Sequence, residues 1–561
     1  MPTLLKPCSF AIAPPVHPTV RPWFSVLRFV DLRSSSMSHA TYCSSTRVPL
    51  MARRPQPFFG SLLASLALLC AAPAMAAVNS GSTGADGEFN PTVNTEVVLP
   101  PSGVLNYTTV NIPLGVTVKF KRNATNTPVY MLATGDVVIA GTIDIQGGTA
   151  PSVGTQGDGV LADDGNPGIG GPGGYDGGRG GRDDVALTPS IIRGGAGLGP
   201  GGGRGGREGD NSCDGLGGYV HYFGTGGAYA ATTRPAWGAD NWVCSTLASE
   251  YHSSAYGSTL LQPLLGGSGG GGGRGGSSFA GSGGGGGGGA ILVASSTSIN
   301  LTGAITARGG AAGGVGGVGG GGNGAGGAGG AIRLVATSIS GSGSLNADGG
   351  CVNQDNNPGN WCGIDGYHHQ LGGSPGRIRL EAEAFTFNGP VSPAVVVDTP
   401  GPLFISAAPS LRISQVADQA VPASPTGTAD VVFPASTTGP VTVTFATTNV
   451  PVGNIITLRV VPAYGFPTDV ISPAIAGSAA AGTTQVSVTL PSGPSTLQAT
   501  TSYTVVVAGT LDLSRFAENE AVDKVVVTVA MVGEPQARLI TASGKSYVVP
   551  YAALRAVGFK G

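Results

Sequence analysis

The sequence predicts an all-β protein in which an N-terminal β-solenoid, with glycine-rich insertions of polyproline II or polyglycine II type, precedes a C-terminal antiparallel β-sandwich. Three observations predict this arrangement. A short strand pattern closed by glycines recurs along the chain, glycine supplies 98 of the 561 residues, and the composition changes near Pro400 to alternating valine and threonine. Repeats that cannot bury an apolar face alone are expected to stack into one continuous core.

The repeated unit reads as two short strands with a bend between them, closed by a pair of glycines. It places a glycine-rich β-solenoid with loop insertions at 128–398. Residues 77–127 are expected to form strands that cap its first unit, because Val116, Val118 and Phe120 alternate there with polar residues. The four copies lie at 128–148, 288–310, 330–350 and, in diverged form, 377–382.

Glycine-rich tracts interrupt the repeats. In one of them Ile169, Pro172 and Tyr175 fall three residues apart, which matches the three residues per turn of a polyproline II helix. Glycine between them would let neighbouring backbones exchange hydrogen bonds, so the tracts would form a bundle beside the strands. The alternative is flexible linkers, and the pattern leaves both open. The tracts lie at 165–182, 194–207, 266–289 and 309–330.

The N-terminus carries an export signal. Two arginines precede an apolar run at 58–69, and an Ala-Met-Ala motif follows, so cleavage is expected between Ala76 and Ala77. Residues 1–50 are then a mis-assigned upstream extension and 51–76 a signal peptide, whereas a membrane anchor would need a longer apolar run. The protein is expected outside the cell or on its surface, with the periplasm as an alternative. No later segment is long and apolar enough to span a membrane.

Four cysteines follow the signal sequence, and export favours disulfides. Three pairings are open. We favour Cys213 with Cys244 and Cys351 with Cys362, because each pair then brackets one insertion. The alternative, a zinc site, would need closer C-x-x-C-like spacing.

Aromatic residues are only 6% of the chain, yet they gather in an insertion at 208–262, and a later insertion carries one more tryptophan. Aromatic faces can stack on sugar rings, so Tyr222, Trp237, Trp242 and Trp361 are the candidate ligand-binding residues. The alternative, which we favour, is that loops without a core of their own pack these rings inward.

The diverged fourth copy carries alternating charges. Arg377, Arg379, Glu381 and Glu383 alternate with apolar residues, so a strand there would place all four charges on one face. One interpretation is a polar site for an acidic sugar. The other, which we prefer, is a solvated face whose ion pairs contribute little to stability.

Residues 404–532 show short alternating runs between proline and glycine turns, the pattern of an immunoglobulin-like β-sandwich. The Cys…Trp…Cys spacing of true immunoglobulin domains is missing. Residues 533–561 read as a C-terminal tail with one further strand and a short helix.

The repeats resemble right-handed parallel β-helix proteins of the pectate-lyase-like class. More closely, they resemble a group of glycine-rich exported proteobacterial proteins that are mostly uncharacterised, on the runs Phe89–Thr95, Val116–Phe120 and Val138–Ile143 and the GGAIRLVA-type repeats. The resemblance covers most of 83–390 and implies export and a right-handed parallel β-helix, not an activity. The glycine tracts are similar to the polyglycine II bundles of phage tail-fibre tips, antifreeze proteins and receptor glycine-rich domains.

The sequence contains no GxSxG, HExxH or Walker motif, and Asp144 and Asp348 near the glycine turns occur singly. No cofactor or metal is expected. With 11% charged residues and a net charge of -2, the chain lacks the clustered lysine and arginine that nucleic-acid binding requires.

Export, repeats and aromatic loops therefore predict a secreted or cell-surface structural or adhesive protein, with extracellular polysaccharide or cell-surface material as its partner. The alternative is an extracellular polysaccharide lyase or glycoside hydrolase, because carboxylates far apart in sequence can meet in space. Whether the protein is an enzyme stays open, although we favour a non-enzymatic role. Ice or crystal binding ranks last, because the outward residues are too mixed to form regular threonine ranks.

Overall fold

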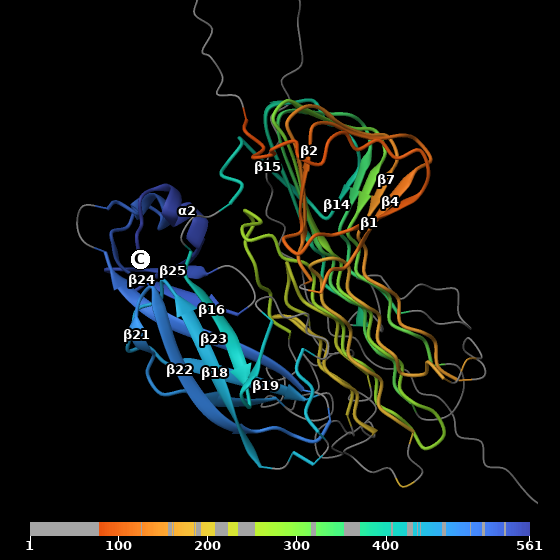
Figure 1. Ribbon diagram of the computed structural model, residues 1–561, viewed down its shortest axis with the longest axis vertical. Helices are drawn as coiled ribbons and strands as arrows, with labels where there is room; N and C mark the ends of the chain where they lie inside the picture. The colour runs from red at the N-terminus through yellow and green to blue at the C-terminus, as the bar shows by residue number, and fades with distance from the viewer. Residues whose placement is uncertain are drawn as a thin grey trace, which may run out of the picture. The chain divides into compact units, whose positions relative to one another are not determined.

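A computed structural model of the chain shows an all-β protein (Figure 1). Among the described residues, no helix has the length and apolar character needed to cross a bilayer. The structure describes residues 78–561 apart from 125, 155–159, 161, 184–185, 187–191, 208–222, 234–252, 316–320, 353–370, 405–407, 423–429, 435, 438, 463–466, 494, 508–510 and 532–534.

The first part of the described chain forms stacked coils of short strands. Matching strands of successive coils pair in parallel, so that β2 pairs with β5, β3 with β6 and β4 with β7. The strands are β1 (Thr95–Val98), β2 (Val104–Tyr107), β3 (Val110–Ile112), β4 (Thr117–Lys121), β5 (Val129–Ala133), β6 (Val137–Ile139), β7 (Thr142–Asp144), β8 (Ala290–Ser295), β9 (Ser298–Leu301), β10 (Ala304–Thr306), β11 (Ala331–Ser340), β12 (Ser344–Asn346), β13 (Arg377–Phe385), β14 (Val391–Ser392) and β15 (Val395–Asp398).

This pairing joins the coils into two parallel sheets. The six-stranded sheet has the order β1-β4-β7-β10-β12-β14, and the nine-stranded sheet runs β2-β5-β8-β11-β9-β6-β3 with β13 and β15 attached. The larger sheet turns back on itself because β11, ten residues long, pairs with β8 along its first half and with β9 along its second. The predicted all-β class is confirmed, while the right-handed sense of the coil stays a prediction.

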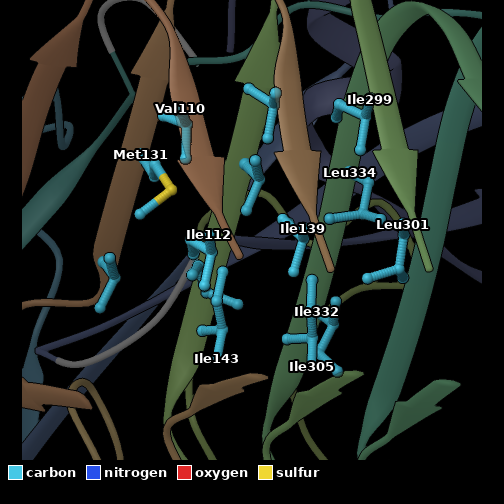
Figure 2. Packing of buried hydrophobic residues seen from close by; sticks show 14 of the residues in the cluster. Val110, Ile112, Met131, Ile139, Ile143, Ile299, Leu301, Ile305, Ile332 and Leu334 are labelled. Atoms are coloured by element: carbon cyan, nitrogen blue, oxygen red, sulfur yellow. The ribbon is translucent and has the colours of Figure 1, made fainter. Parts of the chain in front are cut away.

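Alternate residues of each strand point into the coils. Figure 2 shows aliphatic side chains from successive coils, among them Ile143, Ile305 and Ile332, stacked in one interior. Ile305 pairs with Ile143 on one side and with Leu345 on the other, and all three are at most 1% exposed. Burying such a side chain contributes about 1.5–3 kcal/mol, so stacking supplies a core that no single repeat could form.

The face formed by β5, β8 and β11 is covered on both sides, which explains the uninterrupted apolar sequence of β8. Every residue of β8 is buried. Ile291 and Val293 belong to the interior core, whereas Leu292 packs on the outer side with Tyr229 and Leu261 from the long insertion.

Beyond the strands the chain runs into a layer of glycine-rich segments. Their hydrogen bonds repeat every third residue, as in the pairs Gly267–Gly288, Gly270–Gly285 and Gly273–Ser282 at 2.8–2.9 Å. This is the period predicted from the tracts, so the described tracts form an ordered bundle rather than flexible linkers. We call the following segments the glycine layer: 145–153, 165–172, 174–182, 192–199, 201–207, 223–229, 264–275, 281–289, 307–315, 321–330, 347–352 and 371–376.

The part of the layer at 266–275 is surrounded by other segments. A Cβ built on Gly270 would overlap the carbonyl oxygen of Ala325, and one on Gly273 would overlap that of Gly322. Since neighbours leave no volume for side chains, the segment is glycine at every position except 268 and 274. Its backbone exchanges hydrogen bonds with six segments, 174–182, 192–199, 201–207, 223–229, 281–289 and 321–330.

The C-terminal part of the chain forms two antiparallel sheets around one apolar core. Its elements are β16 (Ser410–Val416), β17 (Gln419–Ala420), β18 (Pro440–Thr448), β19 (Ile456–Pro462), β20 (Thr468–Ile471), β21 (Ala476–Ser478), β22 (Ala481–Thr489), β23 (Ser495–Val506), η4 (Ser514–Phe516), β24 (Val522–Ala530), β25 (Gln536–Thr541), β26 (Ser546–Pro550) and α2 (Tyr551–Ala556). The sheet orders are β17-β16-β18-β22-β21 and β20-β19-β23-β24-β25-β26. Phe445 and Leu458 are fully buried between them. From the segment expected as a tail, Tyr551 and Phe559 join the same core.

Replacing Gly270 by alanine should lower the free energy of unfolding by about 3 kcal/mol, because overpacking a filled interior costs about 1–3 kcal/mol and the backbone neighbours here cannot rotate away. The matched control is Gly135→Ala at a coil corner, where the nearest atoms to a Cβ would lie 3.2 Å away. That substitution should lower the free energy of unfolding by less than about 1 kcal/mol. Denaturant unfolding followed by circular dichroism compares the two, and equal costs would show that the layer relaxes around an added methyl group.

Candidate functional site

A groove of about 780 Å³ lies where the outer face of the six-stranded parallel sheet meets the glycine layer. Its floor carries Glu96, Lys119 and Asp144, which occupy matching positions on the neighbouring strands β1, β4 and β7. In-register pairing extends this row through Thr306 on β10 to Asn346 on β12. Because neighbouring strands lie about 4.8 Å apart, the row presents polar groups at regular intervals along the coils.

The local sequence explains why these side chains reach the groove. In β4, Val118 and Phe120 are buried, whereas Lys119 and Lys121 are exposed. β7 repeats the alternation and directs Asp144 to the same side as Lys119, its partner in the ladder. A period of two thus sends one set of side chains to the core and the other set to the groove.

The glycine layer forms the opposite wall, with Ile169 and Pro172 in the lining. Arg122, just after β4, ties this wall to the coils by an ion pair with Asp176 and a 3.2 Å hydrogen bond to the carbonyl of Gly170. Asp176 in turn accepts a 2.8 Å hydrogen bond from the Gly170 N–H. Both charged side chains are at most 17% exposed, so this pair holds wall and floor at a fixed spacing.

The groove is electropositive. Its charged lining residues are four cations and two carboxylates: Lys119, Lys121, Arg122, Arg308, Glu96 and Asp144. Lys119 and Asp144 form a 3.2 Å ion pair with the lysine 60% exposed, and such pairs contribute little to stability. Lys121 and Arg308 form no ion pair with any residue that the structure describes. They therefore offer positive charge to a ligand.

The groove carboxylates are poorly placed for glycoside hydrolysis. The strand that carries Lys119 separates Glu96 from Asp144, which puts them about 10 Å apart. Glycosidases hold their paired carboxyl groups about 5–9.5 Å apart. In the part of the chain that the structure describes, no group of three or more histidine, cysteine, aspartate or glutamate residues is arranged to hold a metal.

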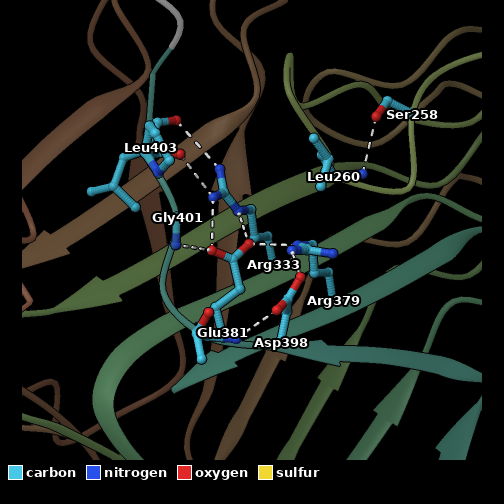
Figure 3. A network of polar contacts seen from close by, with 10 residues as sticks. Ser258, Leu260, Arg333, Arg379, Glu381, Asp398, Gly401 and Leu403 are labelled. Atoms are coloured by element: carbon cyan, nitrogen blue, oxygen red, sulfur yellow. Dashed lines mark hydrogen bonds and ion pairs between the residues drawn. The ribbon is translucent and has the colours of Figure 1, made fainter. Parts of the chain in front are cut away.

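A second polar cluster, which we call the clamp, consists of Arg333 on β11, Arg379 and Glu381 on β13, and Asp398 on β15 (Figure 3). Arg333 donates two hydrogen bonds to the Glu381 carboxylate, at 2.9 and 3.1 Å. Arg379 donates one to Glu381 at 2.6 Å and one to Asp398 at 2.9 Å. The Arg333 and Glu381 side chains are only 2% and 1% exposed.

The clamp corrects the expectation of a solvated charged face on this strand. Arg379 and Glu381 are buried, Arg377 is half-buried, and of the four charges only Glu383 is exposed. The reason is the segment that follows β15, which crosses the face so that Gly401 donates its N–H to Glu381 at 2.8 Å. The alternation predicts a shared face, but it carries no information about what covers that face.

Most site residues expected from the sequence lie outside the described residues, namely Tyr222, Trp237, Trp242, Trp361, Cys213, Cys244, Cys362, Ala76 and Ala77. Cys351, which lines the groove, is disulfide-bonded. Its partner lies outside the described part of the chain, so the pairing with Cys362 stays a prediction. Sequence reasoning missed the groove, although the alternation of Lys119 and Lys121 was visible in a segment assigned only a capping role.

No family model, curated protein or solved structure matches this chain. Two features of the molecule bear on its function, the in-register polar row and the electropositive groove that the first three residues of this row line.

Acidification should destabilise the clamp. Burial raises the pKa of Glu381, because it disfavours the charged carboxylate. The hydrogen bonds and positive charge of Arg333 have the opposite effect, as do the hydrogen bonds from the Gly401 amide and Arg379. Together they lower the pKa of Glu381 below its ordinary value of 4.5. A lowered pKa in the folded state means that the stabilisation is complete above the ordinary value and is lost as the pH falls through the folded-state value.

The Glu381→Gln variant should therefore have a lower melting temperature than the parent at neutral pH. Its melting temperature should fall by less than that of the parent between about pH 5 and about pH 3. Calorimetry across that range measures both effects. Asp144→Asn, at the Lys119–Asp144 pair outside the clamp, is the control and should keep the parent's loss of melting temperature on acidification. Parallel curves for the parent and Glu381→Gln would contradict the assignment.

Proposed function

We propose that this chain is a secreted or cell-surface structural and adhesive protein, built on a right-handed parallel β-helix, whose groove binds an extended anionic glycan. The observation that carries the proposal is the electropositive groove along stacked, in-register strands. The apolar run followed by Ala-Met-Ala at residues 58–76 supports export.

An extended ligand follows from the repetition of the site. Three neighbouring strands each place one polar side chain in the groove, namely Glu96, Lys119 and Asp144. The strand ladder continues this row beyond the groove lining to Thr306 and Asn346. A polymer that runs along the coils can contact many of these groups, whereas a compact ligand reaches only one or two. Repeating hydroxyl and carboxylate groups on a polysaccharide match such a row.

An anionic ligand follows from the charges. Lys121 and Arg308 can make charge-assisted hydrogen bonds to carboxylate or sulfate groups, which are stronger than hydrogen bonds between neutral groups. Ile169, which is 64% exposed, and Pro172 also line the groove. This apolar surface suits the less polar face of a sugar ring, because burying both removes apolar area from water.

The glycine layer supports the structural part of the proposal. Its segments are hydrogen-bonded to one another through the backbone, and the Arg122–Asp176 pair joins it to the coils. The groove is therefore formed before a ligand arrives. A pre-formed site loses less conformational entropy on binding than one that has to be ordered.

The double variant Lys121→Ala/Arg308→Ala should bind polyuronate or sulfated polysaccharide at least about tenfold more weakly, because each hydrogen bond to a charged group contributes about 1.5–3 kcal/mol. Binding of the parent should weaken with added salt, since exposed charges are screened. Immobilised acidic and neutral polysaccharides measure affinity, and chain length in the same samples reports cleavage.

The matched control is Lys524→Ala/Arg538→Ala, which removes the same charge from exposed positions on β24 and β25. Equal losses in the two double variants would mean that net charge, not the groove, drives binding. Cleavage of the polymer would favour the lyase or hydrolase alternative. Absence of binding to every polysaccharide would exclude the groove proposal and leave only the structural role.

A further inference from the structure

The segment that follows β15 lies on the outer face of the coils, beside the clamp. We call residues 399–404 the strap. Arg333 donates hydrogen bonds to the carbonyls of Pro402 at 3.0 Å and Leu403 at 3.3 Å, while Gly401 donates its N–H to Glu381 at 2.8 Å. Figure 3 shows Gly401 and Leu403 above the two clamp residues that bind them.

Apolar contacts hold the end of the strap. Leu403 packs against the outer cluster that contains Leu292 and Val335. The ring of Phe404 lies 5.6 Å from that of Tyr130 on β5, between centroids, although Phe404 is 52% exposed. Hydrogen bonds to the charged clamp residues thus hold the strap at residues 401–403, and apolar packing holds it at Leu403 and Phe404.

The strap belongs to no sheet. Among the described residues, no backbone–backbone hydrogen bond involves any residue from 399 to 404, and Pro400 and Pro402 lack the N–H that strand pairing requires. Its attachment depends on side chains alone. Opening it would therefore break no bond of the parallel ladders, which is the condition for local opening without unfolding.

Glu381 is the residue on which this attachment depends. Arg333 and Arg379 are direct neighbours in the β11–β13 ladder, and like charges at such positions repel. The Glu381 carboxylate lies between them, accepts hydrogen bonds from both, and accepts the strap's Gly401 amide as well. Removing its charge would leave two buried guanidinium groups facing each other beneath the strap.

We propose that the clamp and strap form a latch that sets how far the C-terminal sandwich can move from the solenoid. With the strap closed, the tether runs from Leu403 to the start of β16 at Ser410 and spans at most about 25 Å. With the strap open, it runs from Asp398 and spans at most about 40 Å. The latch therefore has two states that differ in tether length while both domains stay folded.

Chymotrypsin, which cuts after Leu403 or Phe404, tests the latch on the chain from Ala77 onward. Glu381→Gln should speed cleavage at the strap about tenfold, because a hydrogen-bonded charge partner is lost and the open form becomes more populated. Leu403→Ser, which touches no charge, should also speed cleavage after Phe404. Asp144→Asn, the same kind of change at the Lys119–Asp144 ion pair outside the clamp, should leave the rate unaltered.

Cleavage confined to the strap, with an unchanged profile elsewhere, supports the latch. Two results would overturn it. The first is a parental cleavage rate in both Glu381→Gln and Leu403→Ser. The second is cleavage at the strap only together with cuts inside the coils, for example after Leu334 or Phe385, since opening would then require unfolding.

Spin labels at Leu114 and Val452 measure the distance between the solenoid and the sandwich directly. These side chains are 87% and 47% exposed, so both positions can be labelled. In the parent, the distance distribution between the labels should be narrower than in Glu381→Gln, where it should extend to longer distances. Identical distributions in the parent and the variant would overturn the proposal even if the cleavage rates differed.

Discussion

The N–H groups of Gly267, Gly270 and Gly273 reach the carbonyls of segment 281–289. The two backbones can approach this closely because the facing residues lack a Cβ, and one on Gly284 would overlap the carbonyl of Gly270. Glycine loses more conformational entropy on ordering than any other residue, so the layer is stable only where those hydrogen bonds are made and shielded together. The coils allow these hydrogen bonds to form together, because the strands hold the ends of the segments at regular spacings along the stack. The groove in turn depends on the layer, which supplies its wall and is held in place by the Arg122–Asp176 pair.

Regular patterns in the sequence predicted regular structure. The two glycine-closed copies pair residue for residue, with Ile291 beside Ile332, and the spacing of Ile169, Pro172 and Tyr175 predicted the three-residue hydrogen-bond period. The groove was not predicted, because it brings together β1, β4 and β7 with a layer segment that begins well after β7. No local pattern reports which distant segment comes to lie against a strand.

Two strands with the same alternation of charged and apolar residues illustrate that limit. In β4 the outward Lys119 and Lys121 remain exposed, while in β13 the outward Arg379 and Glu381 are buried. The alternation by itself does not tell which of the two faces is exposed. The difference comes from the strap, whose Gly401 binds Glu381 on β13 and whose Leu403 packs on the outer cluster beside β11. Its proline residues keep the strap out of the sheet. Whether a side chain is exposed to solvent thus depends on tertiary contacts, whereas the face of the sheet on which it lies follows from the local alternation.

The three-residue hydrogen-bond period also limits how such a chain can change in length. Inserting one residue into 266–275 would rotate every later N–H by a third of a turn, away from the carbonyls of up to six neighbouring segments at once. Inserting three residues would preserve the phase and only lengthen the segment. Length variation within the layer should therefore accumulate in multiples of three, and single insertions should survive only at the tips where segments turn back.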